Sequence, residues 1–439
     1  MEKGIRNSAE NLLKLEEKMF DKITLKNGLR IITVPLENSK AATVLVLIGT
    51  GSKSEEKETN GISHFLEHMF FKGTKKRPST LKIAETLDQV GGFYNAFTSK
   101  DLTGYWAKVD NQRLDLALDW VSDILLNSTF KERKMETEKK VIIEEINMYL
   151  DTPASYVHDL WEKLLYGDQP AGWMITGKKE TVSKINRSQL LDYFRTHYLS
   201  RNTVICVAGN VNSSSVTLKI KKYFKNIQTG PLSSKPTVIE RQKTPQKLAH
   251  FKKTDQVHFC LGVRACNLSD PKRHAQLVLS TILGGNMSSR LFISVRARAG
   301  LAYYIRTASE SNQDTGYLVT QAGVDLKNLE KAIKIILREY RSFKNKKIAK
   351  KELQKAKDYL KGNLILSLES SDAKAGFYAI QEILENKILT VKERIKEIDR
   401  VSAADIQAVA KEMFRPERLN LALIGPVENK RKFDKILKI

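Results

Sequence analysis

The chain repeats a short pattern at a fixed offset, and this repeat limits the folds open to it more than any other feature. Residues 198–211 read YLSRNTVICVAGNV, and residues 414–427 read FRPERLNLALIGPV. Each segment has an aromatic residue where a helix would end, a short polar turn, an apolar run typical of a buried strand, and a glycine that stops the strand. A single core rarely grows past about 250 to 300 residues. We therefore expect the 439 residues to form two halves related by duplication.

The boundary between the halves is expected between Thr229 and Lys247. Polar residues dominate this stretch, and turn-forming residues interrupt its periodicity at Gly230, Pro231, Ser233, Ser234, Pro236 and Pro245. We predict an N-terminal domain at 1–228, a linker at 229–247 and a C-terminal domain at 248–439.

The local patterns favour a mixed fold. The pair Asn27-Gly28 between alternating apolar residues predicts a β-hairpin, and residues 42–48 predict a buried strand. Helical periodicity follows at 111–127, 132–150, 188–198, 329–343 and 350–367. Because the strands cluster between runs of helices and do not alternate with them regularly, we predict an α+β fold.

The segment His64-Phe65-Leu66-Glu67-His68 predicts a metal site. Two imidazoles four residues apart on a helix project side by side and can bind one metal ion. Glu67, three residues after His64, points to the same face and can reach a metal-bound water. The chain has seven histidines, so a chance pair at this spacing is improbable, and the apolar neighbours indicate a buried helix. Buried histidines need partners, which favours a hydrolytic zinc site over a chance decoration of a polar helix face.

A catalytic zinc site normally has three protein ligands and an open position for water, so this segment lacks one ligand. The helical segment downstream offers Glu138, Glu144 and Glu145. Residues seven apart nearly eclipse one another on a helix, so Glu138 and Glu145 share a stripe with Val141 and Met148, whereas Glu144 lies on a polar stripe. A carboxylate on a largely apolar stripe needs a compensating cation. We predict Glu145 as the third ligand and Glu138 as a residue that orients a histidine ligand or the bound water, with a simple surface glutamate as the alternative for Glu138.

These residues resemble the inverted-zincin metallopeptidases of the pitrilysin/insulysin family, and the details look most like the branch that contains the mitochondrial processing peptidase β subunit and its bacterial relatives. The resemblance rests on residues 61–74, GISHFLEHMFFKGT, followed by Glu138 and Glu145. It implies one zinc ion per chain, bound by His64, His68 and Glu145, with the glutamate between the histidines as general base. It also implies two α+β halves, each with a mixed, largely antiparallel sheet and packed helices, arranged like a clam shell around an enclosed chamber.

Residues 91–99, GGFYNAFTS, are similar to the family strand that binds an extended substrate. A glycine pair followed by alternating aromatic and small residues suits an edge strand whose free N–H and C=O groups can pair with a peptide. The resemblance implies substrate contacts at Phe93, Asn95, Ala96 and Phe97, with backbone hydrogen bonds around Asn95 and Ala96. An ordinary sheet strand after a turn explains the segment equally well.

Arg296 and Tyr303 match the arginine/tyrosine pair that family members contribute from the second half to the active site. A tyrosine hydroxyl can donate to the oxyanion of a tetrahedral intermediate, and an arginine can hold a substrate carbonyl or position that tyrosine. Ala297 stands where the family usually has an acidic residue. This departure removes neither a ligand nor the base.

The net charge of +24 does not by itself predict a nucleic-acid-binding protein. The basic residues are scattered, and no aromatic-interleaved or glycine-rich nucleic-acid motif accompanies them. A lysine-rich solvated surface is the simplest interpretation, and attraction of acidic peptides or anionic surfaces is the alternative.

The remaining composition is typical of a cytoplasmic protein. There is no run of about eighteen or more apolar residues, so no membrane span is predicted, and residues 1–20 carry too many charges for a signal peptide. The three cysteines, Cys206, Cys260 and Cys266, are few and odd in number. We expect small hydrophobic packing in a reducing compartment, with one disulfide as the alternative.

We therefore predict a zinc-dependent endopeptidase that hydrolyses peptide bonds of short or unfolded polypeptides. Glu67 would activate a zinc-bound water and return the proton to the leaving amine, while Tyr303 and Arg296 steady the intermediate. The alternative is a non-catalytic or partner-dependent peptide-binding subunit of the same family, and a nucleic-acid-associated protein is a weaker third interpretation. A homodimer is expected by resemblance. A heterodimer stays open, because some relatives divide the two motifs between two chains.

Overall fold

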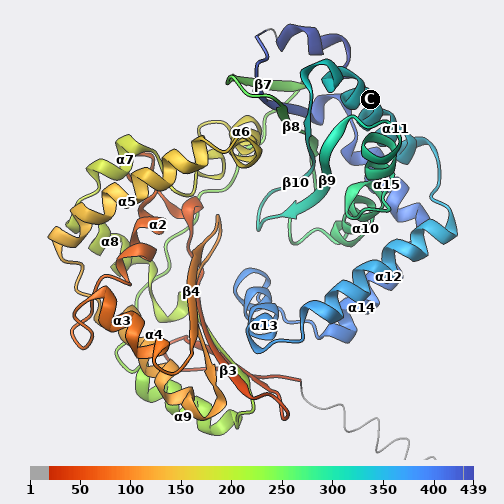
Figure 1. The fold of residues 1–439 in the computed structure, drawn as a ribbon. Coiled ribbons are helices and arrows are strands. Elements are labelled where there is room, and N and C mark those ends of the chain that lie inside the picture. Colours follow the sequence, from red (N-terminus) through yellow and green to blue (C-terminus); the bar gives the residue numbers. More distant parts are fainter. Residues whose placement is uncertain (1–18, 429) are drawn as a thin grey trace, which may run out of the picture.

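The computed structural model describes residues 19–428 and 430–439 of the chain. It contains two α+β halves that face each other in a clam-shell arrangement (Figure 1), which confirms the predicted fold class. The expectation about a signal peptide falls mainly on residues 1–18, which lie outside the described residues. In the part that is described, no helix combines the length and the apolar character needed to cross a membrane.

Each half combines strands and helices in a similar order. The first half contains β1 (Asp21–Thr24), β2 (Arg30–Pro35), β3 (Ala41–Ile48), α2 (Ile62–Met69), α3 (Thr80–Asp88), β4 (Phe93–Thr98), β5 (Thr103–Asp110), α4 (Leu114–Asn127), α5 (Glu132–Leu150), α6 (Pro153–Tyr166), α7 (Lys179–Lys184), α8 (Arg187–His197), β6 (Thr203–Gly209) and α9 (Ser213–Tyr223). The second half contains β7 (Gln246–Phe251), β8 (Val257–Arg264), α10 (Arg273–Gly284), the π-helix η6 (Phe292–Arg298), β9 (Ala302–Ser311), β10 (Gly316–Val324), α11 (Leu329–Asn345), α12 (Lys350–Ser367), α13 (Ser371–Glu385), α14 (Val391–Arg400), α15 (Ala403–Met413) and β11 (Leu419–Gly425).

The two sheets follow one design. The first has the strand order β1-β2-β6-β3-β5-β4, and the second has the order β7-β11-β8-β10-β9. One neighbouring pair in each sheet is parallel, β2 with β6 and β7 with β11, and the other pairs are antiparallel. Strands β2, β3 and β6 recur as β7, β8 and β11 at the offset that relates residue 198 to residue 414, which confirms the duplication. Because β7 repeats β2, it begins at Gln246, inside the stretch predicted as linker.

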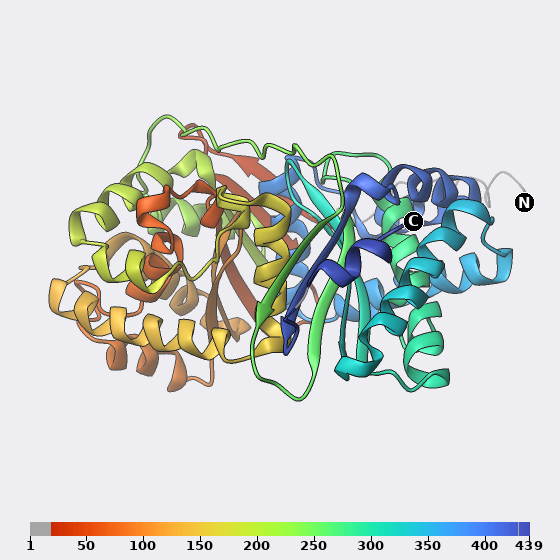
Figure 2. The ribbon, with the colours of Figure 1, turned by 90° about the horizontal axis from the view of Figure 1, so that it is seen from above.

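Each sheet is covered on its inner face by a helix from the opposite half. Helix α6 of the first half packs on the second sheet, where Val157 and Trp161 join a buried cluster with residues of β8, β10 and β11. Helix α13 of the second half packs on the first sheet, where Ala375 and Tyr378 join residues of β2, β3 and β6. Figure 2 shows α6, coloured yellow, beside the strands of the second sheet. The halves have therefore exchanged helices that stand at similar positions in the repeat.

Buried polar contacts also join the halves. The Lys53 ammonium lies 3.1 Å from a carboxylate oxygen of Asp101 in the first half and 2.5 Å from one of Asp314 in the second. Lys235, in the segment between the halves, donates to the Asp101 carbonyl at 2.9 Å and to the Gln313 side chain at 3.1 Å. These contacts fix the segment between the sheets to both of them.

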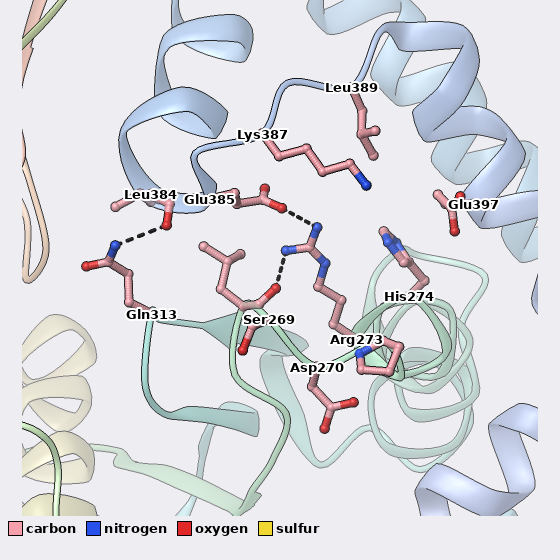
Figure 3. A pocket seen from close by; sticks show the side chains of 12 residues that line it. Ser269, Asp270, Arg273, His274, Gln313, Leu384, Glu385, Lys387, Leu389 and Glu397 are labelled. Atoms are coloured by element: carbon pink, nitrogen blue, oxygen red, sulfur yellow. Dashed lines mark hydrogen bonds and ion pairs between the residues drawn. The ribbon is translucent and has the colours of Figure 1, made fainter.

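The C-terminal end of α13 is tied back to the second half around a cavity of about 410 Å³ (Figure 3). Gln313 donates to the Leu384 carbonyl at 3.0 Å, and the Arg273 guanidinium lies 2.5 Å from the Glu385 carboxylate. All the residues that line this cavity belong to the second half, and none of the predicted site residues is among them.

The predicted elements are confirmed with small shifts at their ends. Helices α5 and α12 have the predicted bounds, whereas α4 begins three residues late because residues 111–113 form a 3-10 turn. The predicted hairpin joins β1 and β2, and Gly28 in its turn has a φ of +86°, where glycine is free of strain. All three cysteines are buried and free, so the disulfide alternative is wrong.

Candidate metal centre and active site

The histidine motif lies on α2, a short helix that its surroundings hold firmly. Gly61 precedes the helix with a φ of +100°, a conformation that glycine adopts without strain. The Glu55 carboxylate accepts hydrogen bonds from the backbone N–H groups of Gly61 at 2.8 Å and Ser63 at 2.9 Å, so it caps the helix from outside. Burial raises the pKa of Glu55 to about 7, against the lowering effect of these bonds. Phe65 and Leu66 are fully buried, as predicted, and fix the direction of the two histidines.

His64, His68 and Glu145 converge on one point. The Nε2 atoms of the two histidines lie 3.2 Å apart. The Glu145 Oε2 atom lies 3.7 Å from His64 Nε2 and 3.5 Å from His68 Nε2. Ligands of a tetrahedral zinc ion, with bonds of about 2.0 to 2.1 Å, lie roughly 3.3 Å from one another. The three donor atoms therefore surround a space that suits one such ion. Among the described residues they form the one group of three or more clustered His, Cys, Asp or Glu donors.

The other ring nitrogen of His68 is held by Glu138. His68 Nδ1 lies 2.8 Å from Glu138 Oε1, and Lys72 Nζ lies 2.7 Å from Glu138 Oε2. Burial disfavours a charged His68, but its bonds to Glu138 and Glu145 outweigh burial and raise its pKa to about 9. Burial also raises the pKa of Glu138, and the bonds from His68 and Lys72 overcome this and lower it. Glu138 is thus a buried residue in contact with a candidate ligand, and the surface alternative is wrong.

His64 has the properties of a neutral metal ligand. Burial, with the neighbouring His68, lowers its pKa to about 4. Its Nδ1 atom is buried and has no hydrogen-bond partner within the described part of the chain. Metal binding requires the uncharged imidazole, and a carboxylate behind a histidine ligand is the usual outer support of a zinc site. The residues present therefore fit a zinc ion.

Glu67 lines a pocket of about 350 Å³ beside the three donor atoms. The Thr98 hydroxyl, at the end of β4, donates to Glu67 Oε2 at 2.5 Å. Burial raises the pKa of the Glu67 carboxyl, and the bond from Thr98 opposes this. The other lining residues are His64, Phe97, Glu145, Tyr149, Asp159, Met174, Ile175 and Thr176. The arrangement places a carboxylate of fixed direction next to the donor atoms.

This pocket is acidic, although the whole chain is strongly basic. Glu67, Glu145 and Asp159 line it, and no lysine or arginine does so among the residues that the structure describes. Burial and the nearby Glu162 raise the pKa of Asp159 to about 6. The pocket therefore gives no support to a preference for acidic peptides at the metal centre.

Glu145 shares a stripe of α5 with Val141 and Met148, and the structure does not bury this stripe. Val141 is 48% exposed and Met148 is 58% exposed, so the assumption that this stripe is buried is wrong. The buried residues of α5 are Met135, Glu138, Ile142 and Ile146. Glu138 belongs to this buried face because His68 and Lys72 compensate its charge. Glu145 lies at the margin of the face, where its carboxylate reaches α2.

The predicted substrate strand is the terminal strand of the first sheet. One edge of β4 pairs with β5, and the sheet order places no strand of the described residues on its other edge. The side chains of Phe93, Asn95 and Phe97 are exposed, with 68% of Phe93 open to solvent. The Ala96 N–H donates to the side chain of its neighbour Asn95 at 2.9 Å. The strand thus combines a free edge with a row of exposed side chains.

Arg296 and Tyr303 lie together in the second half. The Arg296 guanidinium is 4.9 Å from the ring centre of Phe292 and 5.8 Å from that of Tyr303. Tyr303 is 76% exposed on β9, the terminal strand of the second sheet. Within the described residues, no hydrogen bond or ion pair joins either residue to the three donor side chains or to Glu67. The structure brings this pair together without placing it at the metal centre.

Several residues of the site were not predicted from the sequence. Thr98 and Lys72 lie inside the two motifs that carry the family resemblance, and Lys72 follows His68 by four residues, so spacing alone could have suggested it. Asp159 and Met174 come from α6 and from the loop after it, and no local pattern connects them with α2. Their place in the pocket depends on how α6 packs between the halves.

Comparison with known proteins identifies the family of the chain. Residues 30–178 match the family described as Insulinase (Peptidase family M16), and residues 184–360 match the family described as Peptidase M16 inactive domain. The chain belongs to peptidase family M16. The resemblance inferred from the motifs is thereby confirmed.

M16 relatives cover nearly the whole chain. A Bacillus subtilis protein named uncharacterized zinc protease YmxG is 38% identical over 94% of this chain and 99% of its own length. A Streptomyces coelicolor protein named uncharacterized zinc protease SCO5738 is 33% identical over 93% of this chain and 90% of its own length.

Two solved structures share the M16 fold. A Helicobacter pylori protease has a TM-score of 0.87 and 26% identity, covering 93% of this chain and 99% of its own. A Pseudomonas fluorescens structure described as a peptidase M16 inactive domain has a TM-score of 0.85 at 17% identity, covering 93% of this chain and 98% of its own, and supports the fold alone.

Proposed function

We propose that this M16 protein is a zinc-dependent endopeptidase that hydrolyses peptide bonds of short or unfolded polypeptides. One observation carries the proposal: His64, His68 and Glu145 bring three donor atoms within 3.2 to 3.7 Å of one another, beside a pocket that Glu67 lines. The zinc-protease names of the relatives support the same metal.

The side chains of the pocket divide the chemistry between them. A zinc ion held by the three donors would polarise a scissile carbonyl and lower the pKa of water. Glu67 takes the proton from the attacking water and delivers it to the leaving amine. Its burial supports this role, because a raised pKa makes the carboxylate a better base. Thr98 holds the Glu67 carboxylate in direction, and Glu138 does the same for His68.

The substrate pairs with the free edge of β4 as an added strand. An incoming peptide carbonyl replaces the Asn95 side chain at the Ala96 N–H, and the exposed rings of Phe93 and Phe97 contact the substrate side chains. Such pairing requires a stretch of chain whose own N–H and C=O groups are free. Short or unfolded polypeptides supply it, and folded proteins do not.

We assign Tyr303 and Arg296 to the oxyanion of the intermediate. Their support is the family resemblance together with the exposed tyrosine and its contact with the guanidinium. Because both residues lie on the second half, this assignment requires the halves to bring β9 towards the bound substrate.

The test is hydrolysis of a mixed, internally quenched peptide library by the purified chain. We expect the wild type to cleave peptides, a chelator to abolish this cleavage, and added zinc to restore it. The Glu67→Gln variant should bind zinc but cleave no peptide. Glu144→Gln, which changes an exposed carboxylate on α5, is the matched control and should cleave normally.

Cleavage that survives both the chelator and Glu67→Gln would refute the proposal. If the zinc-loaded wild type binds library peptides without cleaving them, the protein is a non-catalytic or partner-dependent peptide-binding subunit and not a peptidase on its own.

A further inference from the structure

A larger cavity adjoins the pocket of the metal centre. Its volume is about 790 Å³, against about 350 Å³ for the pocket, and Asp159 and Met174 line both. Pockets that bind ligands typically measure about 300 to 1,000 Å³. None of the residues given a catalytic or metal-binding role lines this cavity. It therefore offers room for a part of the substrate away from the reacting bond.

Apolar side chains from both halves build its walls. Tyr156, Leu160 and Leu164 repeat every four residues along one face of α6, so they form a continuous stripe. The other apolar lining residues are Ile146 and Leu150 from α5, Trp173 and Met174 from the loop after α6, and Leu248 from β7 of the second half. The walls thus suit aliphatic and aromatic groups.

The cavity is held open by contacts that need no ligand. Helix α6 is anchored on the second sheet by a buried cluster that includes Val157 and Trp161, and Leu160 of the cavity wall belongs to the same cluster. The Trp173 indole donates to Asp168 at 3.0 Å, Asp168 pairs with Lys57, and Lys100 donates to the Trp173 carbonyl at 2.5 Å. A preformed cavity binds its ligand without the cost of ordering its own walls.

Positive charge surrounds the apolar walls. Lys163, Lys178 and Lys179 line the cavity and form no ion pair with any residue that the structure describes, whereas Lys57 is neutralised by Asp168. Against these three lysines stand Glu180 and, at the border with the metal-centre pocket, Asp159. The outer part of the cavity therefore favours an acidic neighbour of an apolar group.

We propose that this cavity is a specificity subsite for a short apolar stretch of the substrate flanked by an acidic residue. The proposal rests on the proposed peptidase function. Since Asp159 and Met174 stand between the cavity and the metal centre, the apolar stretch lies near the cleaved bond without containing it. Lys163 and the two other unpaired lysines contact the acidic flank.

Matched peptides test the preference. Three internally quenched peptides share one cleavage sequence taken from the library. Near it, the first carries Leu-Phe followed by Asp, the second Leu-Phe followed by Lys, and the third Ser-Ser followed by Asp. Each three-residue insert is tested on both sides of the cleaved bond. We expect kcat/KM for the first peptide to exceed that for the Ser-Ser peptide at least about tenfold, because burying large apolar side chains discriminates by that order. The Lys-flanked peptide should fall between them.

Two variants tie the preference to the cavity. Leu164→Trp fills it and should remove most of the advantage of the Leu-Phe peptides over the Ser-Ser peptide. Lys163→Glu changes an exposed side chain and needs no repacking. It should reverse the preference between the two Leu-Phe peptides, so that kcat/KM becomes higher for the Lys flank than for the Asp flank. Leu218→Trp, on the exposed side of α9, is the control for adding an indole and should behave as wild type.

Binding keeps this inference separate from the peptidase. In the Glu67→Gln background, fluorescence anisotropy measures the affinity of each peptide without cleavage. Tighter binding of the Asp-flanked Leu-Phe peptide, lost in Leu164→Trp or reversed by Lys163→Glu, supports the subsite even if the wild type cleaves nothing. Equal affinity for all three peptides overturns the subsite even if the wild type is an active peptidase. So does an unchanged peptide preference in both variants when their unfolding midpoints are also unchanged.

Discussion

The two halves have strands at matching positions, yet only one half of the described chain has a cluster of metal-donor side chains. The offset that relates β2 to β7 places Ser280 opposite His64 and Gly284 opposite His68, both on α10. A Cβ atom at Gly284 would lie 2.2 Å from Oγ1 and 2.7 Å from the backbone N of Thr307 on β9. The helix therefore packs directly on the strand, and no space remains for an imidazole. In the first half a pocket lies between the corresponding elements, the helix α2 and the edge strand β4.

This difference shows how one scaffold supports two roles. In the first half the end of β4 reaches the helix through the bond from Thr98 to Glu67, so the strand that would bind the substrate also holds the carboxylate proposed as the base. In the second half α10 packs tightly on β9 where Gly284 meets Thr307. The side chain of Tyr303, also on β9, is exposed to solvent. Side chains at the contact of helix and edge strand, and not the topology, decide which half can hold a metal.

The largest expected effect comes from the third donor. Glu145→Ala should lose stoichiometric zinc and reduce kcat/KM roughly 10³-fold or more, because it removes a ligand that no neighbour replaces. Lys361, its counterpart in the second half, makes surface ion pairs with Asp358 and Asp399, so Lys361→Ala is the matched control and should retain both properties. Metal analysis and peptide hydrolysis measure the two outcomes. Full zinc content in Glu145→Ala would show that the ligand set is wrong.

The next effect concerns the bond between strand and helix in the first half. Thr98→Val keeps the shape of the side chain and removes the donor, and it should lower kcat about 10- to 100-fold with zinc content unchanged, since a hydrogen bond to a charged group contributes about 1.5 to 3 kcal/mol. Thr98→Ser should restore most of the loss. Thr103→Val, which removes a hydroxyl bonded to the Thr50 carbonyl, controls for loss of a buried hydroxyl on the neighbouring strand. Equal kcat in Thr98→Val and wild type would mean that Thr98 does not position the base.

The closed packing of the second half predicts a stability effect. Gly284→Ala should destabilise the protein by about 1 to 3 kcal/mol, because the added methyl group meets Thr307 and the backbone must shift. At Gly376 on α13 an added methyl group would have no neighbour within 4 Å, so Gly376→Ala should leave stability equal or slightly higher. Urea unfolding of both variants checks the contrast, and an unchanged midpoint for Gly284→Ala would show that the contact of helix and strand is looser than described.

The smallest effect comes from a histidine of low pKa in the second half, away from the metal centre. Burial lowers the pKa of His274 to about 4, with added repulsion from Arg273 and Arg394, which Glu397 and Glu385 oppose. The unfolded side chain takes up a proton near its ordinary pKa of 6.5 and the folded one does not, so this residue contributes stability above about pH 6.5 that is lost as the pH falls towards 4. His274→Gln should lessen the loss of stability between pH 7.5 and 5 by less than about 1 kcal/mol, because the side chain is partly solvated. Unfolding curves at the two pH values measure it, and identical losses in variant and wild type would exclude the effect.

The fold was largely predictable because its signals are local or repeated. Helices α5 and α12 follow from periodicity, and the duplicated strands follow from the repeat itself. The exchange of α6 and α13 could not be predicted, since an amphipathic helix does not reveal which of two similar sheets will cover its apolar face.

The donor set was predictable for a similar reason, and its surroundings were not. The spacing of His64 and His68 determines their geometry on any helix. Glu145 belongs to the donor cluster, but Val141 and Met148, its apolar companions on the predicted stripe, are exposed. Asp159 reaches the pocket from α6, so its position depends on tertiary packing that no spacing records.

The helix exchange has a consequence for the order in which the protein can be completed during synthesis. When a ribosome has made the chain as far as Gln228, the inner face of the first sheet, including Ile32, Leu45 and Cys206, still lacks the helix that will cover it. That helix ends at Glu385, so this apolar face stays uncovered until most of the chain has emerged. The first half therefore cannot mature as a separate nascent domain, and a truncated product would leave the apolar face of its sheet exposed to water.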